Sequence, residues 1–497
     1  MTAKNKSDFL NRHVGLNNSD IKKMLKRLDI KSLDDLIKKV IPKNILSPIS
    51  ENLLKKDLSE TEALAQLKKY SKKNKLYKSF IGMGYYGTLV PNVIKRNILE
   101  NPGWYTQYTP YQAEISQGRL EALLNFQTMI SSATGLPLAN ASLLDESTAA
   151  AEAMTMFYGS TKDNNKNSFF ISKNCHPQTI DVLKTRAEPL GIKLIIGDEN
   201  SSTLDNSIFG MLLQYPASDG KIIDYTDLIN KTKQLKIYTC LATDLLALSI
   251  LKTPAEMGAD AAVGNTQRFG VPMGYGGPHA AFFATSENFK RKLPGRIIGV
   301  SKDIHGNKAL RMALQTREQH IRREKATSNI CTAQVLLAIM SSMYAVYHGP
   351  ENIISIANRV QNLCSNLATS LNHAGIKILH NQFFDTLRIF PNNKWEIAAE
   401  NEKMNFRKFK DGSVGISIDE STIEKDVLII CQIFNADYLP EKNIYSLAGS
   451  LKRVAAFLDH EVFNKYHSET EMLRYIHKLE IKDLSLNNSM IPLGSCT

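Results

Sequence analysis

The chain has 497 residues, of which 43% are apolar and 22% are charged, and its formal net charge is +12. This length exceeds what one hydrophobic core usually supports, and the composition is that of an ordinary globular protein, so we expect two or three domains. The positive charge comes mostly from scattered lysines. Because no basic groove with interleaved aromatic residues accompanies them, we expect no nucleic-acid partner.

The cysteines and the apolar runs indicate the compartment. Six cysteines lie far apart and form no Cys-x-x-Cys pair, so we expect reduced thiols, no disulfide framework and no metal site. No apolar run reaches the roughly eighteen residues that span a bilayer, and the first residues contain no apolar signal core. We therefore predict a soluble, cytoplasmic protein with no membrane partner.

Residues 1–78 are predicted to form an N-terminal helical arm. Apolar residues recur at helical spacing after Ser19 and again after Ser32. Ser59 and Glu62 have the spacing of a capping box, which predicts a third helix after them. The lysine-rich faces of these helices are expected to lie in solvent.

A glycine-rich segment follows, and its Gly82, Gly84 and Gly87 match the G-x-G-x-x-G fingerprint of dinucleotide-binding proteins. That fingerprint has a physical meaning only between a strand and a helix of a βαβ unit, whereas here lysines precede it and a turn follows it. We therefore interpret it as a flexible loop that presents tyrosines, and we keep an NAD-binding oxidoreductase as an alternative. The tyrosines with a predicted cleft-lining or interface role, weighed equally against packing in the core, are Tyr85, Tyr86, Tyr108 and Tyr111.

Two helices are predicted next, an amphipathic one at residues 114–134 and one that opens near residue 143 with strong helix formers. In pyridoxal enzymes the cofactor phosphate rests on such a helix N-terminus, because its N–H groups and its dipole attract an anion. Here Asp145 and Glu146 occupy that end themselves. We interpret them as ordinary caps, which would also exclude a phosphate.

Alternating strands and helices from Ser168 onward predict a doubly wound α/β fold with a mainly parallel sheet. One predicted strand ends just before Asp244 and another just before Gln267. Since the carboxyl ends of parallel strands share a crevice, both side chains are expected to point into it. His176, after the first of these strands, is placed to stack over a ligand ring, although a lone histidine at a strand end is more often structural.

The crevice has the layout of a pyridoxal-phosphate site without its lysine. Such a site needs an acid to hold the pyridinium nitrogen protonated and a lysine to form the imine. Asp244 can serve as the acid. Gln267 stands where the lysine should stand, and an amide has no nucleophilic amine.

The C-terminal part is predicted to contain a smaller α/β domain. Two long apolar helices, at residues 332–347 and 353–373, lead to strands near residues 387–390 and 414–418. The predicted division is an arm at residues 1–78, a large domain at 79–331, a small domain at 332–460 and a separate segment at 461–497.

Long and irregular motifs carry a resemblance to a known family; they lie at residues 82–91, 101–127, 143–154, 267–278 and 316–332. Through them the chain resembles, over essentially its whole length, the N-terminal half of the glycine cleavage system P-protein, glycine dehydrogenase (decarboxylating). Residues 461–497 resemble the beginning of the second half of that protein. The resemblance implies the fold of pyridoxal-phosphate-dependent transferases of fold type I.

In this family only the C-terminal half carries the lysine that binds pyridoxal 5'-phosphate, which agrees with the glutamine in this chain. The resemblance implies that the complete enzyme decarboxylates glycine and passes the aminomethyl group to the lipoyl arm of H-protein. It also implies a C-terminal half, or subunit 2, as partner, with no catalytic residue and no covalently bound cofactor in this chain. The positions that it marks as vestigial are Asp145, Glu146, His176, Asp244 and Gln267.

Two alternatives stay open beside this hypothesis. One is a self-sufficient pyridoxal enzyme that uses an unexpected lysine, and the other is an NAD-binding oxidoreductase that uses residues 82–87. The tail fits either a truncated fused protein or a separate subunit, and the chain alone is expected to be inactive.

Overall fold

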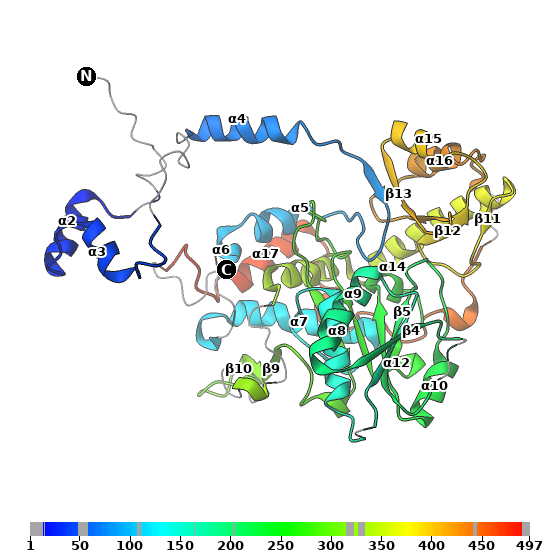
Figure 1. Cartoon of the computed structure of the whole chain (residues 1–497), viewed down its shortest axis with the longest axis horizontal. Coiled ribbons are helices and arrows are strands. Elements are labelled where there is room, and N and C mark those ends of the chain that lie inside the picture. The colour runs from blue at the N-terminus through cyan, green and yellow to red at the C-terminus, as the bar shows by residue number, and fades with distance from the viewer. Residues whose placement is uncertain are drawn as a thin grey trace. The chain divides into compact units, whose positions relative to one another are not determined.

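The computed structural model of the chain divides into two compact units, Met1–Tyr77 and Lys78–Thr497 (Figure 1). The described helices of the first unit are α2 (Asn18–Arg27), α3 (Leu33–Val40) and α4 (Glu60–Ser71). The structure describes residues 13, 15–47, 58–106, 110, 112–163, 165–200, 202, 204–314, 323–326, 333–440 and 445–489.

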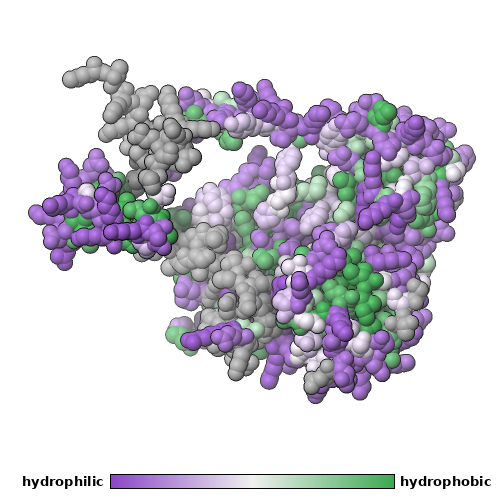
Figure 2. All heavy atoms as spheres, viewed as in Figure 1, coloured by the Kyte–Doolittle hydropathy of each residue, from purple (hydrophilic) through white to green (hydrophobic). Residues whose placement is uncertain are grey.

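Side-chain caps determine where the helices of the first unit begin. The capping box predicted at Ser59 and Glu62 is confirmed. Ser32 caps α3 as expected, but α2 is capped by Asn17, which lies upstream of the predicted Ser19. No residue of these three helices is buried, and Figure 2 shows hydrophobic spheres among hydrophilic ones over α2 and α3.

The second unit is built on a seven-stranded sheet with the order β2-β8-β7-β6-β5-β3-β4. The five strands from β3 to β7 run parallel, while β8 pairs antiparallel with both β7 and β2. The predicted mainly parallel sheet is therefore confirmed. The strands are β2 (Leu138–Ala139), β3 (Ser168–Ser172), β4 (Lys193–Gly197), β5 (Ile208–Tyr215), β6 (Tyr238–Thr243), β7 (Ala261–Asn265) and β8 (Ala281–Thr285).

Helices cover both faces of this sheet. Alternate residues of a strand point to opposite faces, and both faces carry apolar side chains that must be buried. On β3, Phe170 joins the apolar cluster that contains residues of α7 (Gln117–Thr134), while Phe169 and Ile171 join the cluster that contains residues of α8 (Glu146–Tyr158). The helices between the strands are α9 (Pro177–Ala187), α10 (Thr226–Gln234), α11 (Leu245–Leu248) and α12 (Pro254–Met257).

A smaller five-stranded sheet has the order β1-β13-β14-β12-β11. Its first strand was not predicted, because three residues are too short for a recognisable alternation. That strand comes from the start of the unit and pairs parallel with β13. The elements are β1 (Lys78–Phe80), β11 (Lys377–Ile378), β12 (Thr386–Phe390), β13 (Met404–Lys408) and β14 (Val414–Ser417), with the helices α15 (Glu396–Asn401) and α16 (Glu424–Ile433).

The two long helices predicted at residues 332–347 and 353–373 form one kinked element, α14 (Val335–His373). At the kink Gly349 has a φ of 67°, and Pro350 follows it. A side chain at Gly349 would strike the His467 ring at 2.3 Å. Glycine is therefore required both by the backbone conformation and by the close approach.

The segment after residue 460 packs on the large sheet's helical layer. Helix α17 (Glu469–Glu480) crosses α7, and the Asp483 carboxylate accepts hydrogen bonds from the N–H groups of Gly118 and Arg119 at 2.6 and 2.9 Å. Asp483 thus satisfies free donors at the start of α7. Burial raises the pKa of Asp483 to about 6.

The remaining elements are short. A two-stranded antiparallel hairpin, β9 and β10, was not predicted because its exposed turn-side residues break the apolar alternation. No described helix combines the length and the apolar character that crossing a bilayer would need. The bounds are α5 (Asn92–Ile94), η2 (Lys95–Leu99), α6 (Pro102–Tyr105), η3 (Ala113–Ile115), η4 (Glu188–Leu190), η5 (Glu287–Phe289), β9 (Ile297–Lys302), β10 (Lys308–Ala313), η7 (Arg323–Lys325), η9 (Gly449–Leu451) and η10 (Glu461–Asn464).

The crossing of α7 and α17 gives a test of the fold. A Cβ at Gly118 would lie 1.9 Å from the backbone oxygen of Leu479, which cannot rotate away. We expect Gly118→Ala to lower the free energy of unfolding by about 3 kcal/mol. At Gly159 the nearest atom to an added Cβ is 3.5 Å away. The control Gly159→Ala should therefore change the free energy of unfolding by less than about 0.5 kcal/mol. Urea unfolding followed by circular dichroism measures both; an unchanged midpoint for Gly118→Ala would contradict the tight crossing.

Candidate functional site

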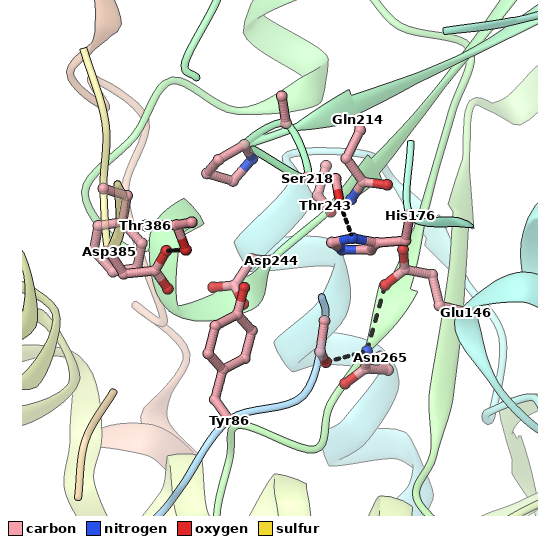
Figure 3. Close-up of a pocket in the computed structure, with 14 residues that line it drawn as sticks. Tyr86, Glu146, His176, Gln214, Ser218, Thr243, Asp244, Asn265, Asp385 and Thr386 are labelled. Carbon is pink, nitrogen blue, oxygen red and sulfur yellow. Dashed lines mark hydrogen bonds between the residues drawn. The ribbon is translucent and has the colours of Figure 1, made fainter. Parts of the chain in front are cut away.

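A small cavity lies at the carboxyl ends of the parallel strands, between the large and the small sheet (Figure 3). Its volume is about 20 Å³, which is room for about one water molecule. This is the place where open α/β sheets bind ligands. The lining residues are Gly84, Tyr86, Glu146, His176, Gln214, Pro216, Ala217, Ser218, Thr243, Asp244, Asn265, Phe384, Asp385 and Thr386.

Asp244 lines the cavity as predicted, but its carboxylate is already bonded on both oxygens. One oxygen accepts the N–H of Ala247 at 2.8 Å and thereby caps α11, and the other accepts a hydrogen bond from Arg268 at 3.0 Å. Arg268 also forms a close ion pair with Asp385, just before β12. Burial lowers the pKa of Arg268, but these two carboxylates raise it more, so the guanidinium stays charged.

Gln267 does not line the cavity, which corrects the prediction that it shares a crevice with Asp244. It is 1% exposed, and its amide binds the backbone of Tyr86. Its Oε1 accepts the N–H of Tyr86 at 2.9 Å, and its Nε2 donates to the carbonyls of Tyr86 at 2.8 Å and Val271 at 2.7 Å. An amide offers the acceptor and the donors that a backbone segment needs, so Gln267 fixes the loop.

The two adjacent tyrosines of this loop lie in different surroundings. Tyr86 enters the cavity, where burial raises its pKa well above the usual value, and its ring lies 3.8 Å from the guanidinium carbon of Arg268. Tyr85 is 36% exposed and meets the His279 ring edge-on at 5.1 Å. Burial, with help from Glu146, raises the pKa of Tyr85 to about 12. The other two predicted tyrosines, Tyr108 and Tyr111, lie outside the described residues.

The glycines of this loop make close contacts with the end of β14 in the small sheet and with the residues just after it. A Cβ at Gly82 would lie 2.1 Å from the Ser417 hydroxyl, and one at Gly87 would lie 2.8 Å from the Asp419 carboxylate. The N–H of Gly87 donates to that carboxylate at 2.7 Å. The loop follows a strand of the small sheet rather than opening a βαβ unit, so nothing in its setting favours dinucleotide binding.

The two acids at the start of α8 differ. Asp145 is the cap that was predicted, since it accepts hydrogen bonds from the N–H and the hydroxyl of Thr148 at 2.7 and 2.9 Å. Glu146 is not a cap, which corrects the prediction for it: its side chain is buried and faces the cavity. Burial raises the pKa of Glu146 to about 8, although the amides of Gln214 and Asn265 oppose the shift.

His176 is buried beside the cavity, and its Nδ1 lies 2.8 Å from the Ser218 hydroxyl. Burial, together with nearby Arg407, lowers the pKa of His176 to about 3, so the ring is neutral at physiological pH. A Cβ at Gly84 would lie 3.3 Å from this ring. The loop therefore packs against the histidine that was expected to stack over a cofactor.

The residues around the cavity do not fit pyridoxal phosphate. None of the described lining residues is a lysine, and the amide of Gln267 is used for the loop. The carboxylate of Asp244 is paired with Arg268, and the Asp145 carboxylate stands at the helix end that a phosphate would need. The cavity volume is also far below that of a cofactor site, which is at least a few hundred Å³.

Sequence reasoning missed the residues that hold this site together. Arg268 directly follows Gln267, but an isolated arginine after a strand has no pattern that predicts burial. Asp385 lies 117 positions away from Arg268, and its pairing depends on how the small sheet docks. Only the tertiary structure brings them together.

Comparison with known proteins gives the relatives of the chain. The family described as glycine cleavage system P-protein matches residues 11–434. Proteins named glycine dehydrogenase (decarboxylating) are similar: that of Nostoc sp. (strain PCC 7120) is 57% identical over 99% of this chain and 51% of its own length. The protein of the same name from Pelagibacter ubique (strain HTCC1062) is 55% identical over 99% of this chain and 52% of its own length. The chain thus spans about half the length of the curated relatives it matches.

Solved structures agree with this assignment. Glycine decarboxylase (P-protein) of the glycine cleavage system, in an inhibitor-bound form, is 31% identical with a TM-score of 0.78, over 85% of this chain and 99% of that chain. A NifS-like protein from Rickettsia africae shares the fold alone, with 14% identity and a TM-score of 0.52; the match covers 72% of this chain and 99% of that chain. The predicted fold type I architecture is confirmed. The chain belongs to the glycine cleavage system P-protein family.

Proposed function

We propose that this chain is the half of a glycine decarboxylase that lacks the imine-forming lysine, and that it works in a complex with the second half. The complete enzyme would decarboxylate glycine and pass the aminomethyl group to the lipoyl arm of H-protein in the cytoplasm. Pyridoxal phosphate, bound by the second half, would supply the electron sink for decarboxylation. The family match and the coverage of half the relatives' length support this proposal.

The observation that carries the proposal is the use of Gln267. All three of its amide hydrogen bonds go to the backbone of the chain itself, so the position opposite Asp244 holds a loop instead of a cofactor. The positions His176, Asp244 and Gln267 are then vestigial with respect to catalysis. They keep a structural role, because they hold the loop that carries Tyr85 and Tyr86.

Tyr85 is the residue of this chain that we propose to line the cleft shared with the second half. It lies beside the half-buried Tyr86 and packs against His279, yet keeps 36% of its surface exposed, so it is still accessible. We extend the same role to Tyr108 and Tyr111. The division of residues 78–497 into a large domain, a small domain and a segment from the second half is part of the same proposal.

Substitution of Gln267 tests whether the site has lost the ability to bind pyridoxal phosphate. We expect the isolated chain to form no imine with pyridoxal phosphate, and Gln267→Lys to form none either. The lysine would leave buried backbone groups of Tyr86 unbonded, at about 1–3 kcal/mol each. A phosphate would also face the Asp145 carboxylate, which costs about 4 kcal/mol per pair of unit charges 4 Å apart at an effective dielectric near 20, against at most about 2 kcal/mol from the helix dipole.

The measurement is borohydride trapping followed by peptide mapping. Gln66→Lys, at an exposed position of α4, is the control for nonspecific labelling of surface lysines. Stoichiometric labelling at position 267, well above that at position 66, would show that the site still accepts the cofactor and would contradict the proposal.

Reconstitution tests the shared cleft. We expect glycine–bicarbonate exchange to appear only when this chain is mixed with the second half and lipoylated H-protein. Tyr85→Ala should then lower exchange by about tenfold or more while the complex still forms. Tyr158→Ala is the matched control, since Tyr158 is 37% exposed but lies at the far end of α8. Equal exchange rates for the two variants in assembled complexes would refute the role of Tyr85.

A further inference from the structure

Two buried acceptor atoms face the cavity without a hydrogen-bond donor. They are Oε1 of Glu146 and Oε1 of Gln214, and neither accepts a hydrogen bond from any described residue. Glu146 is 6% exposed and Gln214 is 3% exposed, so bulk water does not satisfy them. The Nε2 of the Gln214 amide donates to the Ala242 carbonyl at 3.3 Å, and the same amide lies close enough to Glu146 to lower the pKa of that carboxyl. Leaving such acceptors unpaired is costly, which indicates a donor in the cavity.

The charges around the cavity favour a cation. Asp244 and Asp385 share the single guanidinium of Arg268, which leaves one negative charge unbalanced. Asp145 adds another at the start of α8. Arg407 opposes them from the side of Ser218, to which it is hydrogen-bonded at 2.8 Å. His176, between these groups, is neutral.

The size and the hydrogen-bonding groups of the cavity limit which ligands it can bind. The cavity of about 20 Å³ admits one atom with its hydrogens. Among the described residues no group of His, Cys, Asp and Glu side chains could hold a metal ion. A water molecule brings the two donors that these two oxygen atoms need but no charge, whereas an ammonium ion brings N–H donors and a positive charge in nearly the same volume. We propose that the cavity binds an ammonium ion, held by the free Oε1 atoms of Glu146 and Gln214.

The protonation of Glu146 gives the site a pH dependence. Ammonium binds the ionised carboxylate better, so its affinity should rise as the pH increases toward the raised pKa of Glu146, about 8. The charged and titratable groups that face Glu146 from the neighbouring elements are Asp145, Asp244, Tyr85, Tyr86, Cys175 and Cys240. Burial raises the pKa values of the cysteines and the tyrosines, so they stay neutral in this range.

Thermal unfolding of the full chain in matched salts tests the proposal. We expect a saturable rise in Tm of roughly 3 °C in ammonium chloride over potassium chloride, at an ammonium concentration about 100 times its Kd. Methylammonium should give a smaller rise because its methyl group has no room, and tetramethylammonium should give none. Equal Tm values in ammonium and potassium chloride would overturn the proposal and leave water as the occupant.

Two variants on α8 test whether the rise in Tm caused by ammonium comes from binding in the cavity. Glu146→Gln removes the charge and brings its own N–H donors, so ammonium affinity should fall at least about tenfold. Glu152→Gln is the matched control, because Glu152 is 4% exposed on the same helix but pairs with Arg186 outside the cavity. An ammonium shift that persists in Glu146→Gln would overturn the proposal.

A second measurement on the unmodified chain does not depend on how the variants fold. Equilibrium dialysis with ¹⁵N-ammonium should show one bound ion per chain, with an affinity about tenfold higher at pH 8.5 than at pH 6.5. No bound ion, or an affinity that falls over this range, would overturn the proposal.

Discussion

The buried guanidinium of Arg268 is the interaction on which the arrangement of the second unit depends. It extends from the loop after β7, pairs with Asp244 at the end of β6, and pairs with Asp385 at the start of β12 in the small sheet. Tyr86 stacks on it at 3.8 Å. Removing one partner of such a buried pair costs about 3–5 kcal/mol, because the remaining charge cannot be hydrated. One side chain therefore fixes two sheets and a loop together.

The polar groups at this edge of the sheet are bonded mainly to the chain itself. Gln267 binds the backbone of Tyr86, and Asp244 caps a helix and pairs with Arg268. A site that binds a ligand keeps such groups available, because the ligand must supply their partners. Among the described residues that line the cavity, Glu146 and Gln214 each keep one buried oxygen without a hydrogen bond, and the space beside them is correspondingly small.

Local patterns predicted the parts of the fold that depend on nearby residues. The parallel sheet, the helix that begins at Asp145 and the position of Asp244 at a strand end followed from periodicity and capping. The burial of Glu146 and the pairing of Arg268 with Asp385 did not, because both depend on contacts between segments more than 100 residues apart. Gln267 was recognised as an absent lysine, but its hydrogen bonds to Tyr86 became visible only in three dimensions.

The pairing of β1 with β13 can form only late in the synthesis of the chain. Phe80 is made early, yet its partner strand begins at Met404, so the ribosome must add roughly 320 residues before the two meet. At about 5–20 residues per second, this takes roughly 16–65 s. During that time the strand has no partner, and Phe80, which is 3% exposed in the finished structure, is open to water or to a chaperone. The first strand of the second unit is thus among the last to find its place.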